Sequence, residues 1–168
     1  YARLPPPDRA PLDLNALVRE VLGLYENSQA RIELMLAEDL PPIRGDASQL
    51  RQIIHNLLRN AEDAQEGMED PRIGIVTQGG GAMAVLTVND CGTGFPPEMM
   101  ARIFEPYVTT KAHGTGLGLA IVKKIVDEHG GAIRIQNRQP SGAQISILLP
   151  LALPVGAETF IDTEISTE

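Results

Sequence analysis

The sequence predicts an α/β two-layer sandwich, in which a mixed sheet of about five strands is covered on one face by three helices. Three segments repeat apolar residues at helical spacing, and five shorter segments are strand-like. Glycine or proline separates most of these segments, as expected at turns. With 168 residues, of which 43% are hydrophobic, the chain can bury one sizeable core but is short for two domains.

The first half of the chain is expected to form two helices and one strand. Residues 1–11 carry three consecutive prolines and no periodicity, so we interpret them as a linker that leaves a preceding element. A first helix is predicted from Asp13, a helix-capping residue, to about residue 27. An alternating strand over 32–36 and a second helix over 46–67, with one apolar stripe, follow.

The second half is expected to supply four strands and the third helix. Two neighbouring strands, 73–78 and 83–88, are separated by three glycines that suit a hairpin turn. The third helix is predicted over 116–129, where two glycines end it. The last two strands are expected over 132–137 and 143–149.

Two stretches lack a regular pattern. Between 92 and 116, glycines and prolines interrupt all but a short helical piece around 98–104, which is typical of a functional loop. After Pro150 the sequence becomes polar and acidic, so 151–168 is predicted to be a flexible tail. The domain between linker and tail is expected to span residues 12–150.

The charge and the cysteine content limit the possible partners. A net charge of −8 argues against binding to nucleic acid or to an anionic membrane, because such binding is largely electrostatic. No apolar stretch approaches the roughly 20 residues that span a bilayer, so we expect a cytoplasmic domain. The chain lacks an initiator methionine and is expected to be a fragment of a longer protein. Its single cysteine, Cys91, cannot form an internal disulfide.

Asn56 and Asn60 lie one helical turn apart in the second helix, so their amides share one face beside the apolar stripe. Neutral oxygen ligands beside a polyphosphate suit Mg²⁺, which takes oxygen donors and keeps several waters or phosphate oxygens. The alternative is a polar helix edge whose amides bond a neighbouring strand or solvent. The pair alone does not decide between the two.

Asp90, Gly92 and Gly94 form an Asp-x-Gly-x-Gly turn directly after an apolar strand. A carboxylate at this place can accept a hydrogen bond from the exocyclic amine of adenine, and the glycines let the backbone approach a flat base. An ordinary Asp-Gly turn is the alternative. The turn is therefore a candidate wall for a nucleotide base.

Glycines at 114, 116 and 118 open the third helix. They admit a phosphate to the free backbone N–H groups of the helix start, where the helix dipole favours negative charge. The pattern is not the dinucleotide-binding fingerprint, because a long loop instead of a strand leads into it. Lys111, just ahead of the glycines, can add positive charge beside a phosphate or can be a solvated loop lysine.

The ordered set of motifs resembles the Bergerat-type ATP-binding fold shared by histidine kinases, gyrase, the Hsp90 chaperones and mismatch-repair ATPases. The chain is most similar to the histidine kinases, whose N, G1, F and G2 boxes correspond to residues 55–61, 90–94, 103–107 and 114–119. The resemblance spans roughly 12–149. The short Thr-Thr-Lys lid and the Asn-Ala-Glu-Asp-Ala ending of the N box are similar to the NtrY type of nitrogen-regulation sensor kinase.

This resemblance implies a nucleotide site in which each motif has a role. Asn60 would bind the Mg²⁺ that bridges the ATP phosphates, and Asp90 would read adenine. Gly92 and Gly94 would shape the adenine wall, and the loop that follows them would be the ATP lid. The residues expected to close over the phosphates are Gly114, Thr115, Gly116, Leu117 and Gly118.

Asn56 stands where the ATP hydrolases of this superfamily carry a glutamate that activates water. An amide cannot accept that proton at neutral pH, so the resemblance implies transfer to an external nucleophile, with Asn56 and Lys111 as candidate catalytic residues. In the family the nucleophile is a histidine on a separate dimerisation domain, which passes the phosphoryl group to a response regulator. The implied parent protein is a homodimer that can be anchored in the bacterial inner membrane. An ATP-hydrolysing clamp and a non-catalytic nucleotide-binding module are the alternatives.

Asp63 departs from the family pattern. It lies one turn beyond Asn60, where many relatives carry a lysine that faces the phosphates. A carboxylate there repels phosphate unless Mg²⁺ or water intervenes, so Asp63 is a nucleotide-site candidate only in that indirect form. Lys111 and Arg102 are then the expected positive partners of the phosphates.

The three histidines of the chain are expected not to accept the phosphoryl group. His55 lies in the N box, His113 in the lid and His129 at the end of the third helix. None of them begins the His-Glu or His-Asp helix start that is typical of the phosphoacceptor. The substrate histidine is therefore expected on another domain.

Overall fold

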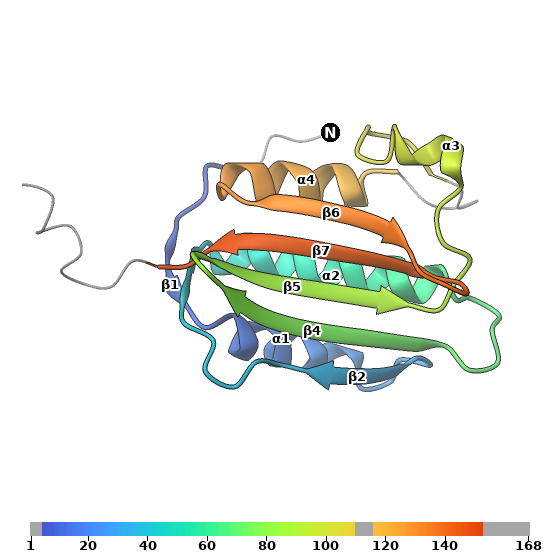
Figure 1. Ribbon diagram of the computed structural model, residues 1–168, viewed down its shortest axis with the longest axis horizontal. Helices are drawn as coiled ribbons and strands as arrows, with labels where there is room; N and C mark the ends of the chain where they lie inside the picture. Colours follow the sequence, from blue (N-terminus) through green and yellow to red (C-terminus); the bar gives the residue numbers. More distant parts are fainter. Residues whose placement is uncertain (1–4, 110–115, 153–168) are drawn as a thin grey trace, which may run out of the picture.

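The structure is a computed structural model that describes residues 5–109 and 116–152. Its main layer is a five-stranded sheet. β2 pairs with β4 in parallel, and the other three pairings are antiparallel, so the sheet is mixed, as predicted (Figure 1). The strands, in spatial order, are β2 (Arg31–Met35), β4 (Arg72–Gly80), β5 (Met83–Asp90), β7 (Ala143–Pro150) and β6 (Ala132–Asn137).

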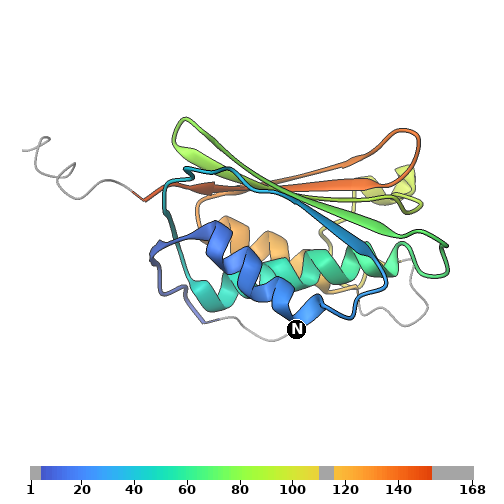
Figure 2. The ribbon, with the colours of Figure 1, turned by 90° about the horizontal axis from the view of Figure 1, so that it is seen from below.

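Three helices, α1 (Leu14–Leu22), α2 (Ala47–Asp63) and α4 (Gly118–Glu128), lie against one face of the sheet, and no described helix covers the other face (Figure 2). This arrangement confirms the predicted two-layer α/β sandwich. Two shorter helical pieces, η1 (Gly23–Tyr25) and α3 (Pro97–Met100), extend the first helix and interrupt the long loop. Within the described ranges, no helix is long and apolar enough to cross a membrane.

The core lies between the two layers because each element turns one apolar face inward. Alternate residues of β5 and β7 are buried, and so is one stripe of α2. Burial of this apolar surface is the main source of the stability of the domain. The residues with no exposed surface at all include Val18, Leu58, Val122, Ile125 and Ile147.

Several element boundaries differ from the predicted ones, and one of these differences affects the site. The first helix ends at Leu22 instead of near residue 27, because the chain tightens into η1 and then turns. β5 runs on to Asp90, two residues further than predicted. The candidate adenine-binding carboxylate therefore belongs to the sheet itself.

A small second sheet was not predicted. It joins β1 (Ala10–Leu12) to β3 (Ile43–Gly45) in antiparallel pairing. Strands of three residues show too little alternation to be detected in a sequence, and their pairing depends on tertiary contacts. Leu151 also bridges to Ile43, so described residues near both ends of the expected 12–150 domain are tied to the same short strand.

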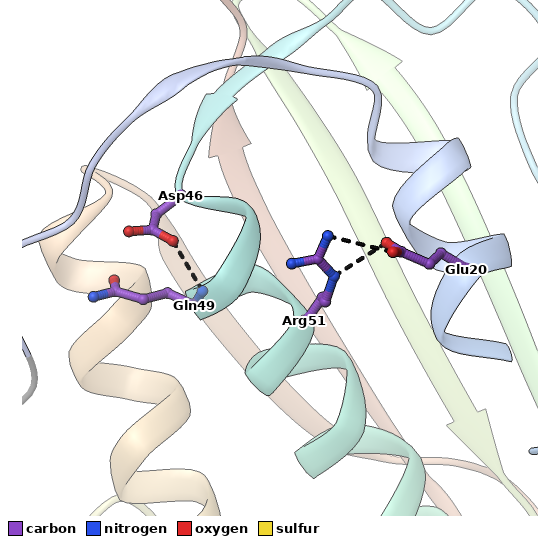
Figure 3. Close-up of polar contacts among 4 residues, drawn as sticks. All are labelled: Glu20, Asp46, Gln49 and Arg51. Atoms are coloured by element: carbon purple, nitrogen blue, oxygen red, sulfur yellow. Dashed lines mark hydrogen bonds and ion pairs between the residues drawn. The ribbon is translucent and has the colours of Figure 1, made fainter. Parts of the chain in front are cut away.

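The start of α2 is held by hydrogen bonds around Asp46 (Figure 3). Its Oδ1 accepts from the backbone N–H of Gln49 at 3.1 Å, which caps the helix. Its Oδ2 accepts from the backbone N–H of Asp8 at 2.8 Å, and its own N–H donates to Nε2 of His129 at 3.0 Å. One residue therefore links the incoming chain, α2 and the end of α4.

Replacing Asp46 with alanine is expected to lower the free energy of unfolding by about 1–2 kcal/mol at neutral pH, because the cap of α2 is lost. Burial alone would raise the pKa of Asp46, but backbone N–H groups, including those of Asp8 and Gln49, outweigh burial and lower the pKa below 3.8. The stabilisation is therefore present above pH 3.8 and is lost as the pH falls through the folded-state pKa. Urea unfolding at several pH values measures it.

The control for this variant is Glu20→Ala. Glu20 forms an exposed ion pair between α1 and α2 with Arg51, at 3.1 Å (Figure 3). Such surface pairs contribute roughly 0–1 kcal/mol, so this variant should lose less stability than Asp46→Ala. Equal losses in the two variants would contradict the capping role of Asp46.

Candidate functional site

Asp90, the last residue of β5, is buried, with 6% of its surface exposed. Its Oδ1 accepts hydrogen bonds from the backbone N–H groups of Gly92 (2.8 Å) and Ala143 (3.2 Å). Burial raises the pKa of Asp90, and these hydrogen bonds and the charge of Arg138 act in the opposite direction. Because both bonds use Oδ1, the second carboxylate oxygen is left to accept from a ligand donor such as an exocyclic amine.

The glycines after Asp90 lie where a side chain would collide with a neighbouring element. A Cβ on Gly92 would be 2.5 Å from the carbonyl oxygen of Ala64, just beyond the last residue of α2. Gly94 has a φ of +76°, and its Cβ would be 2.7 Å from Oδ1 of Asn137 at the end of β6. The turn therefore packs directly between α2 and β6, which brings the candidate base wall beside the helix that carries the asparagines.

Two side chains that sequence reasoning missed hold this turn from the side of β6. Arg138 Nη1 donates to the carbonyl oxygen of Asp90 at 2.8 Å. Asn137 accepts from the backbone N–H of Phe95 at 2.8 Å and donates to its carbonyl oxygen at 2.9 Å. Asn137 is the last residue of a predicted strand and Arg138 follows it, but only the order of the strands in the sheet shows what they contact.

Gln65 holds the turn from the side of α2 and was also missed. It is 2% exposed, and its Nε2 donates to the carbonyl oxygen of Ala61 at 3.0 Å. Its Oε1 accepts from the backbone N–H groups of Arg72 (2.8 Å) and Cys91 (3.3 Å). A polar residue that continues the apolar stripe of the second helix is the sequence signal that could have singled it out.

Asn56 lies on the side of α2 that faces α4, since its Nδ2 reaches the carbonyl oxygen of Gly118 at 3.5 Å. This distance is long for a hydrogen bond, so the contact holds the amide only loosely. Asn60 follows one turn later and, like Asn56, is half-buried, which agrees with a shared face. Asp63 is the last residue of α2 and is exposed.

The start of α4 faces open space. Gly118 is its first residue, and no heavy atom of the described residues is recorded within 4 Å of the position that a Cβ would occupy. Leu117 precedes it, and Gly116, with a φ of +72°, accepts a hydrogen bond from the N–H of Tyr107 at 2.9 Å. The first N–H groups of a helix lack intrahelical acceptors, so this end can receive an anion. Residues 110–115 of the predicted lid and glycine box lie outside the described residues, among them Lys111, His113, Gly114 and Thr115.

The two described histidines make contacts within the fold. His129 is 1% exposed, and its ring nitrogens lie 3.0 Å from the backbone nitrogen of Asp46 and 2.8 Å from the carbonyl oxygen of Ile125. His55 Nδ1 lies 3.1 Å from the hydroxyl oxygen of Tyr25. His129 therefore joins the end of α4 to the start of α2, and His55 joins α2 to η1.

The side-chain oxygen atoms that this site offers as ligands suit Mg²⁺ only together with a polyphosphate. No group of three or more His, Cys, Asp or Glu side chains that could hold a metal occurs in the described part of the chain. Amide oxygens such as that of Asn60 are ligands that Mg²⁺ accepts when phosphate and water complete its shell. Arg102, an expected phosphate partner, forms an exposed ion pair with Glu105 at 2.9 Å.

Comparisons with known protein sequences find a matching family and similar proteins. Residues 45–153 match the family described as histidine kinase-, DNA gyrase B-, and HSP90-like ATPase. An NtrY-like sensor histidine kinase of Rickettsia felis is 39% identical over 163 residues, which cover 93% of this chain and 27% of the relative. The chain thus spans about a quarter of the length of the curated relatives that it matches.

Solved structures show the same architecture. The catalytic domain of histidine kinase ThkA matches with a TM-score of 0.78 and 32% identity, over 86% of this chain and 96% of that domain. A crystal structure of ThkA in complex with the response regulator protein TrrA matches with a TM-score of 0.75 and 28% identity, over 87% of this chain and 42% of that one. Both matches cover most of the chain, and their sequence identities are high enough to support a shared family as well as a shared fold.

Proposed function

We propose that this chain, which belongs to the family of histidine kinase-, DNA gyrase B- and HSP90-like ATPases, binds Mg²⁺ and ATP and transfers the γ-phosphoryl group to a histidine on a separate dimerisation domain. Family membership confirms the resemblance inferred from the four sequence boxes. The named relatives are sensor histidine kinases, which are phosphotransferases, and the structural match is to a catalytic domain. Because the chain spans only part of such relatives, the activity of the whole protein belongs to the proposal.

The adenine side of the proposed site is the end of β5. Asp90 accepts from the exocyclic amine with the oxygen that its backbone hydrogen bonds leave available. Gly92 and Gly94 bring the backbone close enough to form a flat wall for the base. Recognition of adenine over other bases thus depends on one buried acceptor.

The phosphate side is the edge between α2 and the start of α4. Asn60, with Asp63 acting indirectly, would hold the Mg²⁺ that neutralises the phosphates. Gly116, Leu117 and Gly118 place backbone N–H groups around the phosphate oxygens. The remaining residues of this side lie outside the described residues and keep the roles proposed for them from the sequence: Lys111, Gly114 and Thr115.

Asn56 is the residue that most favours phosphoryl transfer over ATP hydrolysis as the activity of this site. Its amide lies beside the start of α4, at the position where the superfamily's hydrolases carry a glutamate. A neutral amide cannot take a proton from water, so the site can position ATP but lacks a base for an attacking water. Phosphoryl transfer depends mainly on positioning and on neutralising charge, and an external histidine supplies the nucleophile.

The partners proposed for the parent protein follow from this half-reaction. We propose that residues 1–11 connect the 12–150 catalytic domain to a His-bearing dimerisation domain of the same homodimeric protein. A response regulator would then receive the phosphoryl group, in line with the complex of ThkA with TrrA. The net charge of −8 speaks against a nucleic-acid partner. We place the domain in the cytoplasm, with an inner-membrane anchor in the parent protein.

The test is to mix the purified chain with the dimerisation domain of its parent protein and γ-labelled ATP. We expect acid-labile phosphohistidine on the dimerisation domain, and chelation of Mg²⁺ should abolish it. Asn60→Ala should lower the rate by about tenfold or more, because metal stabilisation of charge contributes several kcal/mol. The exposed Asn27→Ala is the matched control and should keep the full rate.

Two other outcomes of this mixture would point to the alternatives. Steady-state phosphate release by the isolated chain, lost in Asn56→Ala, would support an ATP-hydrolysing clamp. Nucleotide binding without any phosphohistidine would support a regulatory module. Either result would contradict the proposed kinase activity. Neither result would change the family or the fold of the chain.

Nucleotide affinity is expected to fall on acidification at a higher pH than for an ordinary aspartate, because burial raises the pKa of Asp90. Protonation turns the acceptor that faces the exocyclic amine into a donor. A raised folded-state pKa means that the charged form destabilises the fold, and this cost disappears as the pH falls through that pKa. Acidification therefore weakens binding through Asp90 without a loss of stability from this group. Titration of ATP binding against pH, compared with Asp90→Asn, isolates this effect, which the variant should lack.

A further inference from the structure

Strand β2 forms one edge of the five-stranded sheet, and its outer side has no partner strand in the described ranges. The N–H of Arg31 donates to the carbonyl oxygen of Pro71 at 2.9 Å, so the backbone groups of Arg31 face β4. Successive strand residues direct their backbone groups to opposite sides, so those of Ile32 and Leu34 point away from the sheet. Such an exposed row of N–H and C=O groups is a template for another strand.

Exposed apolar side chains gather at this edge. β2 carries Leu34 (43% exposed) and Met35 (72%), and η1 carries Leu24 (75%). A hollow of about 270 Å³ adjoins β2, and its lining includes Tyr25 of η1 together with Ile32 and Leu34. Three of the five large hydrophobic residues exposed in the described part of the chain thus belong to β2 and η1, and exposed apolar groups of this kind can take part in an interaction surface.

The charges on β2 decide which partner strand fits. Arg31 and Glu33 are both exposed and, being two residues apart, lie on the same face of the strand. If a second copy of β2 lies antiparallel with the two-fold axis through Ile32, each Arg31 faces Glu33 of the second copy. The symmetric contact therefore contains two opposite-charge pairs, so the strand is complementary to itself.

We propose that the β2 edges of two copies of this chain pair antiparallel about Ile32 and join their sheets into one. The outward backbone groups allow the two Ile32 residues to exchange both N–H···O=C hydrogen bonds. An axis through Glu33 also uses the outward groups, but it sets two Glu33 carboxylates face to face. An axis through Leu34 sets Glu33 opposite Met35 and forms no charge pair. The Ile32 register is the one that combines the outward hydrogen bonds with two opposite-charge pairs.

Sedimentation velocity of the intact chain over a concentration series tests this pairing. The wild-type chain is expected to shift from monomer to dimer as the concentration rises. Glu33→Arg places two arginines opposite each other twice and should raise the dimer dissociation constant roughly ten- to a hundredfold. Arg31→Glu should do the same, and the double exchange Arg31→Glu with Glu33→Arg restores both charge pairs and should recover the wild-type constant.

Asp127→Arg is the matched control, because it makes the same charge change at an exposed position near the end of α4, which lies apart from β2 (Figure 1). It should leave the dissociation constant unchanged, and all variants should bind ATP alike, so the result is independent of the proposed kinase activity. In the dimer, the amides of Ile32 and Leu34 should exchange hydrogen more slowly. A monomer throughout the series, single reversals without effect, or a double exchange that fails to recover dimerisation would each overturn the proposal.

Discussion

Replacing Asp90 with asparagine is expected to weaken ATP binding by roughly a hundredfold without unfolding the domain. The backbone N–H groups of Gly92 and Ala143 hold one carboxylate oxygen. Asparagine can satisfy these donors only with its amide oxygen, which turns its NH₂ group toward the ligand. The exocyclic amine of adenine then meets a donor instead of an acceptor, and losing a hydrogen bond to a charged group costs about 1.5–3 kcal/mol.

Calorimetric titration with ATP and with inosine triphosphate, which lacks the exocyclic amine, separates this effect from a general loss of binding. The wild-type chain should prefer ATP, and the variant should lose that preference. Asp39→Asn is the control, since Asp39 is exposed beside the β4–β5 hairpin at the other end of β5. The unfolding free energy of Asp90→Asn should equal or exceed that of the wild type, because a buried charge is removed. Unchanged preference for ATP would remove Asp90 from the adenine site.

Much of the fold and the motif positions could be predicted because they follow from local patterns. The apolar stripe of α2 determines which side of this helix meets the sheet, and Asn56 and Asn60 must then lie beside that stripe. Asp90 follows directly after an alternating strand, so its place at a strand end could be inferred from the sequence. Each of these inferences needs only neighbours within a few residues.

The groups that shape the site from a distance could not be predicted. Ala143 bonds the carboxylate of Asp90 across a separation of 53 residues, and this contact exists only because β7 returns beside β5. Arg138 reaches the carbonyl oxygen of Asp90 for the same reason. No local pattern contains the order of strands in a sheet, so the residues that orient the adenine acceptor stayed hidden while the acceptor itself did not.

Replacing Gly142 with alanine is expected to lower the free energy of unfolding by roughly 2–4 kcal/mol. Gly142 has a φ of +108°, a conformation that alanine adopts only with strain. A Cβ there would also collide with the carbonyl oxygen of Asp90. The N–H of Arg138 donates to the carbonyl oxygen of Gly142 at 2.8 Å, so the turn cannot shift without pulling on the groups that hold Asp90.

Gly80→Ala provides the contrast, because Gly80 ends β4 and, in the described part of the chain, no heavy atom lies within 4 Å of its Cβ position. That substitution should be neutral or should stabilise by up to about 1 kcal/mol, through the lower entropy of the unfolded chain. At a temperature where Gly142→Ala is still folded, its affinity for ATP should fall more than its affinity for inorganic triphosphate. The collision displaces the adenine acceptor but does not reach the start of α4. Equal losses for both ligands would mean that the damage spreads through the whole site, and that the β6–β7 turn does not position Asp90 specifically.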